Sequence, residues 1–243
     1  MNKSKIVITF LIWILLSQIA NAQFVSRFSI FGGFTAGWYI PDISTINTEL
    51  NKAGIPSLNT DGAVTLGGHG YLDVPKVTGL RLGYMGTGFT LNSNQVSSGN
   101  LKKKASLVYR MGGLSAEYVS LLGKYFDFTF GSNFGMGSYT VKLFQIDPNY
   151  GNWNTVFGEI GSNGSSQTIS RNLRQTFYTI QPKVGIGFQA KSFLYFKFNT
   201  GYSFTFDSGW EDENGIELTN VPGNIKADGF FTDLSVNLGL FFR

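Results

Sequence analysis

Residues 229–243, "GFFTDLSVNLGLFFR", alternate large apolar side chains with small or polar ones. Successive side chains of an extended strand point to opposite faces, so the pattern predicts a β-strand with one apolar and one polar side. Two kinds of structure contain such strands: a soluble sheet that covers a core, and a membrane barrel whose apolar side meets lipid. The apolar side would carry Leu234, Val236, Leu238, Leu240 and Phe242, and the polar side Asp233, Ser235, Asn237 and Gly239.

The N-terminus has the pattern of a secretory signal peptide. Two lysines precede an apolar run at residues 6–16, and residues 20–22 (Ala-Asn-Ala) supply the small side chains of a cleavage site. The run is shorter than the ~20 residues that a membrane-spanning helix needs. We therefore expect residues 1–22 to be removed and residues 23–243 to form one exported domain.

The composition is unusual for a water-soluble domain. Only 14% of the 243 residues are charged, whereas 16% are aromatic and 31 are glycine. Because soluble domains average about a quarter charged residues, much of the outer surface is expected not to meet water. The absence of cysteine excludes disulfides and thiol chemistry. With 19 basic against 15 acidic side chains, nothing indicates a nucleic-acid partner.

Alternation like that of the last strand recurs along the chain and predicts eight strands. The connectors between them are long and short in turn, which is typical of an up-and-down barrel and not of a Greek-key sandwich. In two strands the phase of the alternation changes, near Gly86 and at Gly112 and Gly113, and we expect a β-bulge near Gly86. The other strands are expected at residues 27–40, 63–74, 77–91, 105–122, 125–144, 176–190 and 193–206, with long connectors at 41–62, 92–104, 145–175 and 207–228 and short ones at 75–76, 123–124 and 191–192.

The first long connector contains a short amphipathic segment. Ile43, Ile46 and Leu50 recur at helical spacing, and Gly54 and Pro56 end the pattern. A helix over residues 44–52 is therefore expected to plug or cover one mouth of the barrel. Docking to a partner or to a membrane surface is the alternative.

Volume decides which side of the strands faces inward. The interior of an eight-stranded barrel is just wide enough for side chains to fill it, and it cannot hold most of 23 phenylalanines. Glycine, serine, threonine and asparagine fit a narrow lumen, and the apolar side then faces lipid. The sequence thus predicts an all-β, eight-stranded antiparallel transmembrane barrel.

Charged side chains fall on the polar side of these strands. Both signs are present, so the charges can pair with one another, and unpaired they would be costly in so dry a space. We expect a closed polar network, and the alternative is a hydrated conduction path through the same residues. The predicted lumen charges are Arg81, Arg110, Glu117, Asp127, Lys183, Lys197 and Asp233.

The export signal, the alternating strands, the sorted loops and the last strand ending at Phe242 together resemble small bacterial outer-membrane barrels of the OmpA, OmpX and OmpW kind. The resemblance implies export through the general secretory pathway, a location in the outer membrane, extracellular long loops and periplasmic short turns. It also implies contact with outer-membrane lipid and lipopolysaccharide, and recognition of the last strand, Leu234 to Phe242, by the barrel-assembly machinery. Arg243 departs from the pattern, because the aromatic residue is usually last.

The sole histidine, His69, falls on the lumen side near Tyr71 and Asp73. Some small outer-membrane barrels are enzymes that act on lipid or protein through a histidine with acidic or serine partners, so a lipid-modifying enzyme is one alternative. A hydrogen-bonding lumen residue is the expected role. No ligand spacing for a metal is present, and we expect no cofactor.

The long loops carry the remaining candidates. Tyr150, Trp153 and Trp210 would suit contact with a partner or a glycan. The lysines at residues 102–104 would lie near anionic lipopolysaccharide head groups, or would be simply solvated. The expected function is therefore a non-enzymatic structural or surface-interaction role with no identified surface partner, and a narrow pore for small or apolar solutes is the main alternative.

Overall fold

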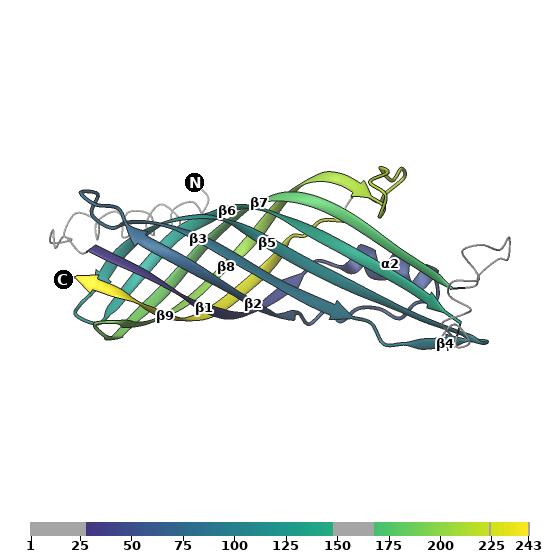
Figure 1. The fold of residues 1–243 in the computed structure, drawn as a ribbon, viewed down its shortest axis with the longest axis horizontal. Helices are drawn as coiled ribbons and strands as arrows, with labels where there is room; N and C mark the ends of the chain where they lie inside the picture. The colour runs from purple at the N-terminus through teal and green to yellow at the C-terminus, as the bar shows by residue number, and fades with distance from the viewer. Residues whose placement is uncertain (1–27, 148–167, 224, 243) are drawn as a thin grey trace, which may run out of the picture.

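The computed structural model describes residues 28–147, 168–223 and 225–242 (Figure 1). The signal peptide expected at residues 1–22 lies outside the described residues. In the described part of the chain, no helix is long and apolar enough to cross a membrane.

Eight antiparallel strands form a closed ring in chain order, as predicted. Consecutive strands of the ring pair with one another, β3 pairs directly with β5, and the pairing of β1 with β9 closes the ring. A ninth, short strand, β4, pairs with β5 beside the ring. The elements are β1 (Phe28–Pro41), α2 (Ser44–Lys52), β2 (Ala63–Asp73), β3 (Leu80–Asn92), β4 (Val96–Ser98), β5 (Leu101–Leu122), β6 (Phe126–Ile146), β7 (Ile169–Lys191), β8 (Leu194–Glu211) and β9 (Gly229–Phe242).

The two ends of the barrel differ. The connectors that contain α2 and β4 lie at one end, on the right of Figure 1, together with the β8–β9 connector. The tight turns after β2, β5 and β7 lie at the other end, where β9 also finishes. We call these the long-loop end and the short-turn end.

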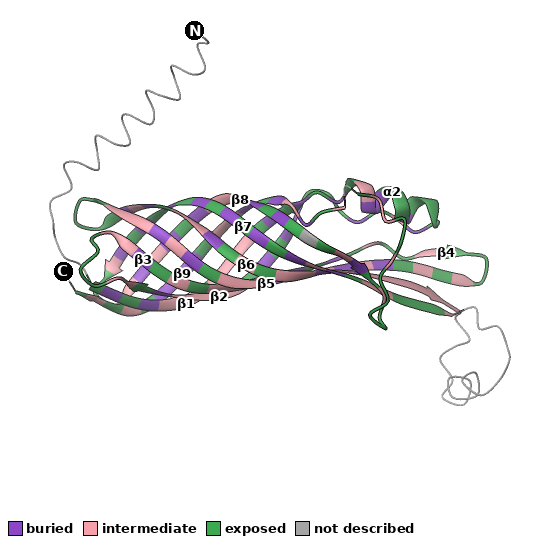
Figure 2. Cartoon of the chain, turned by 90° about the horizontal axis from the view of Figure 1, so that it is seen from above, coloured by how far each residue is buried: buried purple, intermediate pink, exposed green. Residues whose placement is uncertain are grey.

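Exposure alternates along the strands in the inverted sense, with apolar side chains outside and polar ones inside (Figure 2). On β9, Leu238 is 62% exposed and its neighbour Asn237 is 0% exposed. A closed sheet leaves no unpaired edge, so such a barrel can cross a lipid bilayer. The exposed apolar belt includes Phe34, Val64, Leu82, Leu114, Phe130, Phe134, Val184, Ile186, Phe198, Phe204 and Leu234.

The β-bulge expected near Gly86 is absent. The pairing of β3 with β5 runs without a shift from one end of β3 to the other, and so does the pairing of β5 with β6. What changes is the environment. Toward the long-loop end, Phe89 and Tyr109 point inward and are buried, and Arg110 is exposed on the outside. The strands there leave the apolar belt, so polar residues face out and apolar residues face in.

This extension beyond the belt also makes three connectors shorter than predicted. β5 begins at Leu101, β6 and β7 reach Ile146 and Ile169, and β8 reaches Glu211. The inward apolar side chains of these extensions are buried, and this burial stabilises the strands beyond the apolar belt.

The inward apolar side chains form a core at the long-loop end, and α2 is part of it. Ile43, Ile46 and Leu50 are buried against the inward residues of the strands, so the helix plugs this mouth, as expected. Lys103 Nζ donates a hydrogen bond of 3.0 Å to the carbonyl of Ala53, which helps to hold the C-terminal end of the helix. Aromatic rings stack beneath it, with centroid distances of 5.0–5.5 Å among Tyr39, Phe89, Tyr109 and Phe177.

Candidate functional site: the charged lumen

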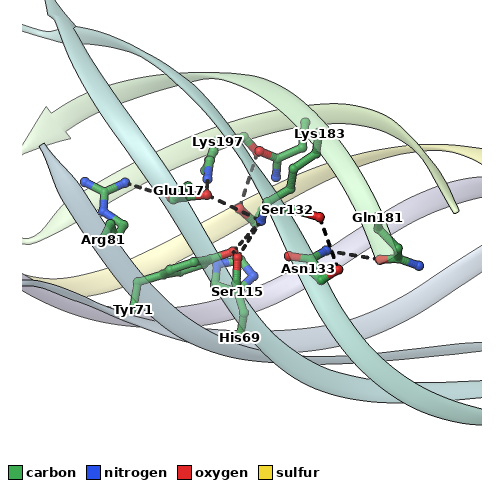
Figure 3. A network of polar contacts seen from close by, with 12 residues as sticks. His69, Tyr71, Arg81, Ser115, Glu117, Ser132, Asn133, Gln181, Lys183 and Lys197 are labelled. Atoms are coloured by element: carbon green, nitrogen blue, oxygen red, sulfur yellow. Dashed lines mark hydrogen bonds and ion pairs between the residues drawn. The ribbon is translucent and has the colours of Figure 1, made fainter. Parts of the chain in front are cut away.

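A cluster of ion pairs fills the middle of the barrel, and Glu117 is at its centre (Figure 3). The carboxylate of Glu117 lies 2.5 Å from Lys197 Nζ, 3.3 Å from Lys183 Nζ and 3.3 Å from Arg81 Nη1. The side chains of Glu117 and Lys197 are both 0% exposed. One carboxylate from β5 thus binds cations from β3, β7 and β8.

Hydrogen bonds extend the cluster to the neighbouring strands. Arg81 Nε lies 2.9 Å from Asp73 Oδ1, which joins β3 to β2. Lys183 Nζ donates to the hydroxyls of Tyr71 at 2.8 Å and Ser115 at 3.0 Å. The three cations therefore have anionic or hydroxyl partners, which offsets part of the desolvation that buried charges suffer.

The other two predicted lumen carboxylates also face inward and are hydrogen-bonded. The Tyr195 hydroxyl donates to Asp127 Oδ1 at 2.8 Å, and Asn199 Nδ2 donates to Asp233 Oδ1 at 2.8 Å. Six of the seven predicted lumen charges thus lie in the lumen.

Arg110 is the exception, and its assignment to the lumen is wrong. It lies on the outer face of β5 between the buried side chains of Tyr109 and Met111, and it is exposed. The strand keeps its register, so the residue must point outward. Its charge is tolerated because β5 is leaving the apolar belt at this level.

His69 bridges three strands at the wall of the lumen. Its Nδ1 lies 2.8 Å from Thr35 Oγ1 on β1, and its Nε2 lies 2.5 Å from Asn237 Oδ1 on β9. Its ring packs edge-on against Tyr71 at 5.0 Å. The adjoining cavity has a volume of about 40 Å³, which is space for one or two water molecules.

Aromatic side chains narrow the lumen between the ion pairs and the short-turn end. Phe31, Tyr195 and Phe241 pack together with centroid distances of 5.2–5.6 Å. The guanidinium of Arg81 lies 4.8 Å above the Phe31 ring, a cation–π arrangement. Outside this layer, a vestibule of about 410 Å³ opens at the short-turn end, with Asp73 in its lining.

The last strand has the outer face that the sequence predicts. Its alternate apolar residues are exposed along the whole pairing of β9 with β1 and β8. Recognition of this strand by an assembly machinery stays a prediction. The exposed residues are Leu234, Val236, Leu238, Leu240 and Phe242.

The predicted loop contacts fare differently. Tyr150 and Trp153 lie outside the described residues. Trp210 is only 5% exposed, because β8 continues to Glu211 and places its ring 6.3 Å from that of Tyr139, so its assignment as a loop contact is wrong.

In the β8–β9 connector, hydrogen bonds from the backbone N–H groups of Ile216 and Asn214 lower the pKa of Asp212. The described residues contain no group of three metal-ligating side chains.

No protein-family model matches the chain, and no curated protein matches it. Solved structures similar to it are bacterial outer-membrane proteins. A major outer membrane protein from Thermus thermophilus is 10% identical, with 88% of this chain and 99% of that chain covered and a TM-score of 0.44. Ail, the attachment invasion locus protein of Yersinia pestis, is 11% identical, with 89% and 98% covered and a TM-score of 0.35.

The outer membrane protease OmpT of Escherichia coli is also similar, with 11% identity, 91% of this chain and 99% of that chain covered, and a TM-score of 0.33. The fold of this chain is assigned from its own strand pairing and pattern of exposure, independently of these similarities. A closed ring of eight antiparallel strands with an apolar outer belt is a transmembrane β-barrel of the bacterial outer-membrane type.

Proposed function

We propose that the protein is a non-conducting, non-enzymatic outer-membrane barrel with a structural or surface-interaction role. The ion-pair cluster around Glu117 is the observation that carries this proposal. Its charges bind one another, and its central side chains are completely buried. A charged lumen of this kind supports the barrel wall and leaves no wide path for a solute.

Two further layers support a closed lumen. The core that includes α2 fills the long-loop end, and the aromatic residues around Phe31 narrow the other side. Between them, the cavity of about 40 Å³ beside His69 is far smaller than a typical ligand pocket. Both ring nitrogens of His69 have hydrogen-bond partners, which favours a structural role over general-base catalysis.

In this proposal the long-loop end faces the outside of the cell and the short turns face the periplasm. Lys102 and Lys104 lie on the outer face of β5 beyond the apolar belt, where they would meet anionic lipopolysaccharide. Lys103, between them, is bound to the end of α2. The surface role is therefore assigned to the extended strands and loops of this end.

Planar-bilayer recording tests the closed lumen. The refolded protein, residues 23–243, is expected to give no reproducible conductance steps. Lys197→Ala and Asp233→Ala should mainly lower stability, because each leaves a buried partner group without its bond. Lys191→Ala, at an exposed position near the short-turn end, is the matched charge control. Steps from the unaltered barrel whose size shifts with Lys197→Ala, and not with Lys191→Ala, would establish the pore instead.

A further inference from the structure

The lipid-facing surface has a shallow, open hollow that crosses β3, β5, β6 and β7. The backbone at Gly112, Gly113 and Gly135 forms its floor. Its apolar walls are highly exposed, and Leu114 reaches 67%. The wall residues are Tyr84, Leu114, Phe134, Met136 and Tyr178.

The hollow exists because outward positions in its floor are glycine and carry no side chain. Close packing of the strands does not require glycine at these positions. A Cβ at Gly112 would meet only the flexible end of Tyr84 closely, with the hydroxyl oxygen 3.1 Å away. Gly112 pairs with Gly86 on β3, where a Cβ would have 3.7 Å to its nearest neighbour. The outer face is therefore open at these two glycines, although the backbone there would accept larger residues.

A positively charged side chain, Arg110, lies next to one end of this hollow. Arg110 is the next outward residue after Gly112 toward the long-loop end, ~7 Å further along β5. It pairs with Gly88 on one side and Ser138 on the other, so small residues flank it. Among the described residues no carboxylate forms an ion pair with Arg110, in contrast to Arg81.

Among the described residues, an apolar groove thus lies beside a cation that has no carboxylate partner, and together they match an amphipathic anion. We propose that the groove holds an acyl chain of a lipopolysaccharide molecule, and that a phosphate group of its lipid A binds Arg110. Arginine suits this role because its guanidinium can form paired, charge-assisted hydrogen bonds with phosphate oxygens. The choice of lipopolysaccharide over a glycerophospholipid rests on the proposed function, which places the long-loop end in the outer leaflet.

Lipid binding to the refolded, delipidated barrel tests the site. Native mass spectrometry in detergent would count bound lipid A and, separately, bound phosphatidylglycerol. Wild-type protein is expected to hold one lipid A tightly, and Arg110→Gln and Gly112→Leu should each weaken that binding about tenfold, by removing the charge or filling the groove. Lys191→Gln and Gly70→Leu are the matched controls, and we expect them to change binding by less than about twofold.

The two controls make the same kinds of change, loss of a positive charge and replacement of glycine by leucine, at positions away from the groove. Lys191 is exposed near the short-turn end, and a Cβ at Gly70 on β2 would meet only the Phe31 carbonyl, at 3.8 Å. A heat-dependent shift in gel mobility would show that every variant is folded. Equal lipid A binding by wild type, Arg110→Gln and Gly112→Leu overturns the site.

Tighter binding of phosphatidylglycerol than of lipid A at the same residues overturns the assignment to lipopolysaccharide. A barrel that conducts ions and still binds lipid A through Arg110 would contradict the closed lumen alone. The two proposals can therefore fail separately.

Discussion

Replacing Glu117 with alanine is expected to lower the free energy of unfolding by about 3–5 kcal/mol, the range for removing one partner of a buried ion pair. The carboxylate is the shared partner of Arg81, Lys183 and Lys197, so its loss leaves three buried cations short of an anion. Urea unfolding of the barrel in lipid vesicles, followed by tryptophan fluorescence, would measure the change.

A surface pair provides the control for this prediction. Glu49 lies 2.7 Å from Lys52 on α2, with the two side chains 45% and 67% exposed. Because exposed ion pairs contribute about 0–1 kcal/mol, Glu49→Ala should leave stability almost unchanged. If Glu117→Ala cost no more than Glu49→Ala, the ion-pair cluster would not be what stabilises the wall.

Replacing Gly113 with valine is expected to prevent formation of the folded barrel. Gly113 on β5 pairs with Gly135 on β6. A Cβ at Gly113 would lie 2.3 Å from the Phe134 carbonyl oxygen and 2.4 Å from the Gly135 Cα. These are backbone atoms held in the sheet, so the strands would have to separate. Loss of the heat-dependent gel shift and of β-sheet circular dichroism after refolding would report the failure.

The neighbouring glycine separates this steric effect from a general need for flexibility. Gly112→Val places the same side chain on the outer face, where only the end of Tyr84 must move. This variant should refold with a yield close to that of the unaltered barrel. Equal folding of the two valine variants would show that the backbones of β5 and β6 do not approach so closely at Gly113.

The parity of each strand was sufficient to predict most of the lumen. Once one face of a strand is apolar, every second residue belongs to the other face, and this places Glu117, Lys183 and Lys197 inside without any knowledge of their contacts. The assignment holds wherever a strand crosses the apolar belt. It also predicts the outward face of β9, from Leu234 to Phe242.

Arg110 was misassigned because parity was tied to a single environment. Trp210 was misassigned for another reason: the strand was expected to end at residue 206, and β8 continues to Glu211. Beyond the belt, the outside of the wall meets water and the inside becomes an apolar core, so the meaning of each face reverses while the strand continues. The sequence does carry a signal for this edge. The phase of alternation changes near Gly86 and near Gly112, and these residues are directly paired. Two adjacent strands that change phase at one level indicate the end of the belt more simply than a bulge does.

The partners within the lumen could not be derived from the sequence. Arg81 reaches both Asp73 on its own hairpin and Glu117 on the next strand, and Lys197 reaches Glu117 across 80 residues of chain. Such pairs depend on the register of strands around the closed ring. The same is true of His69, whose partners Thr35 and Asn237 come from the first and last strands.

Photolabelling of the native protein from within the bilayer tests the inverted barrel most directly. Vesicles that contain a phospholipid with a diazirine in its acyl chain would be irradiated, and labelled residues located by peptide mass spectrometry. Label is expected on Leu234, Val236 and Leu238 and not on Ser235 or Asn237. None is expected on Leu107 or Tyr109, which are apolar but point into the core beyond the belt. Label on Leu107 and Tyr109, or on both faces of β9 alike, would contradict the inverted barrel.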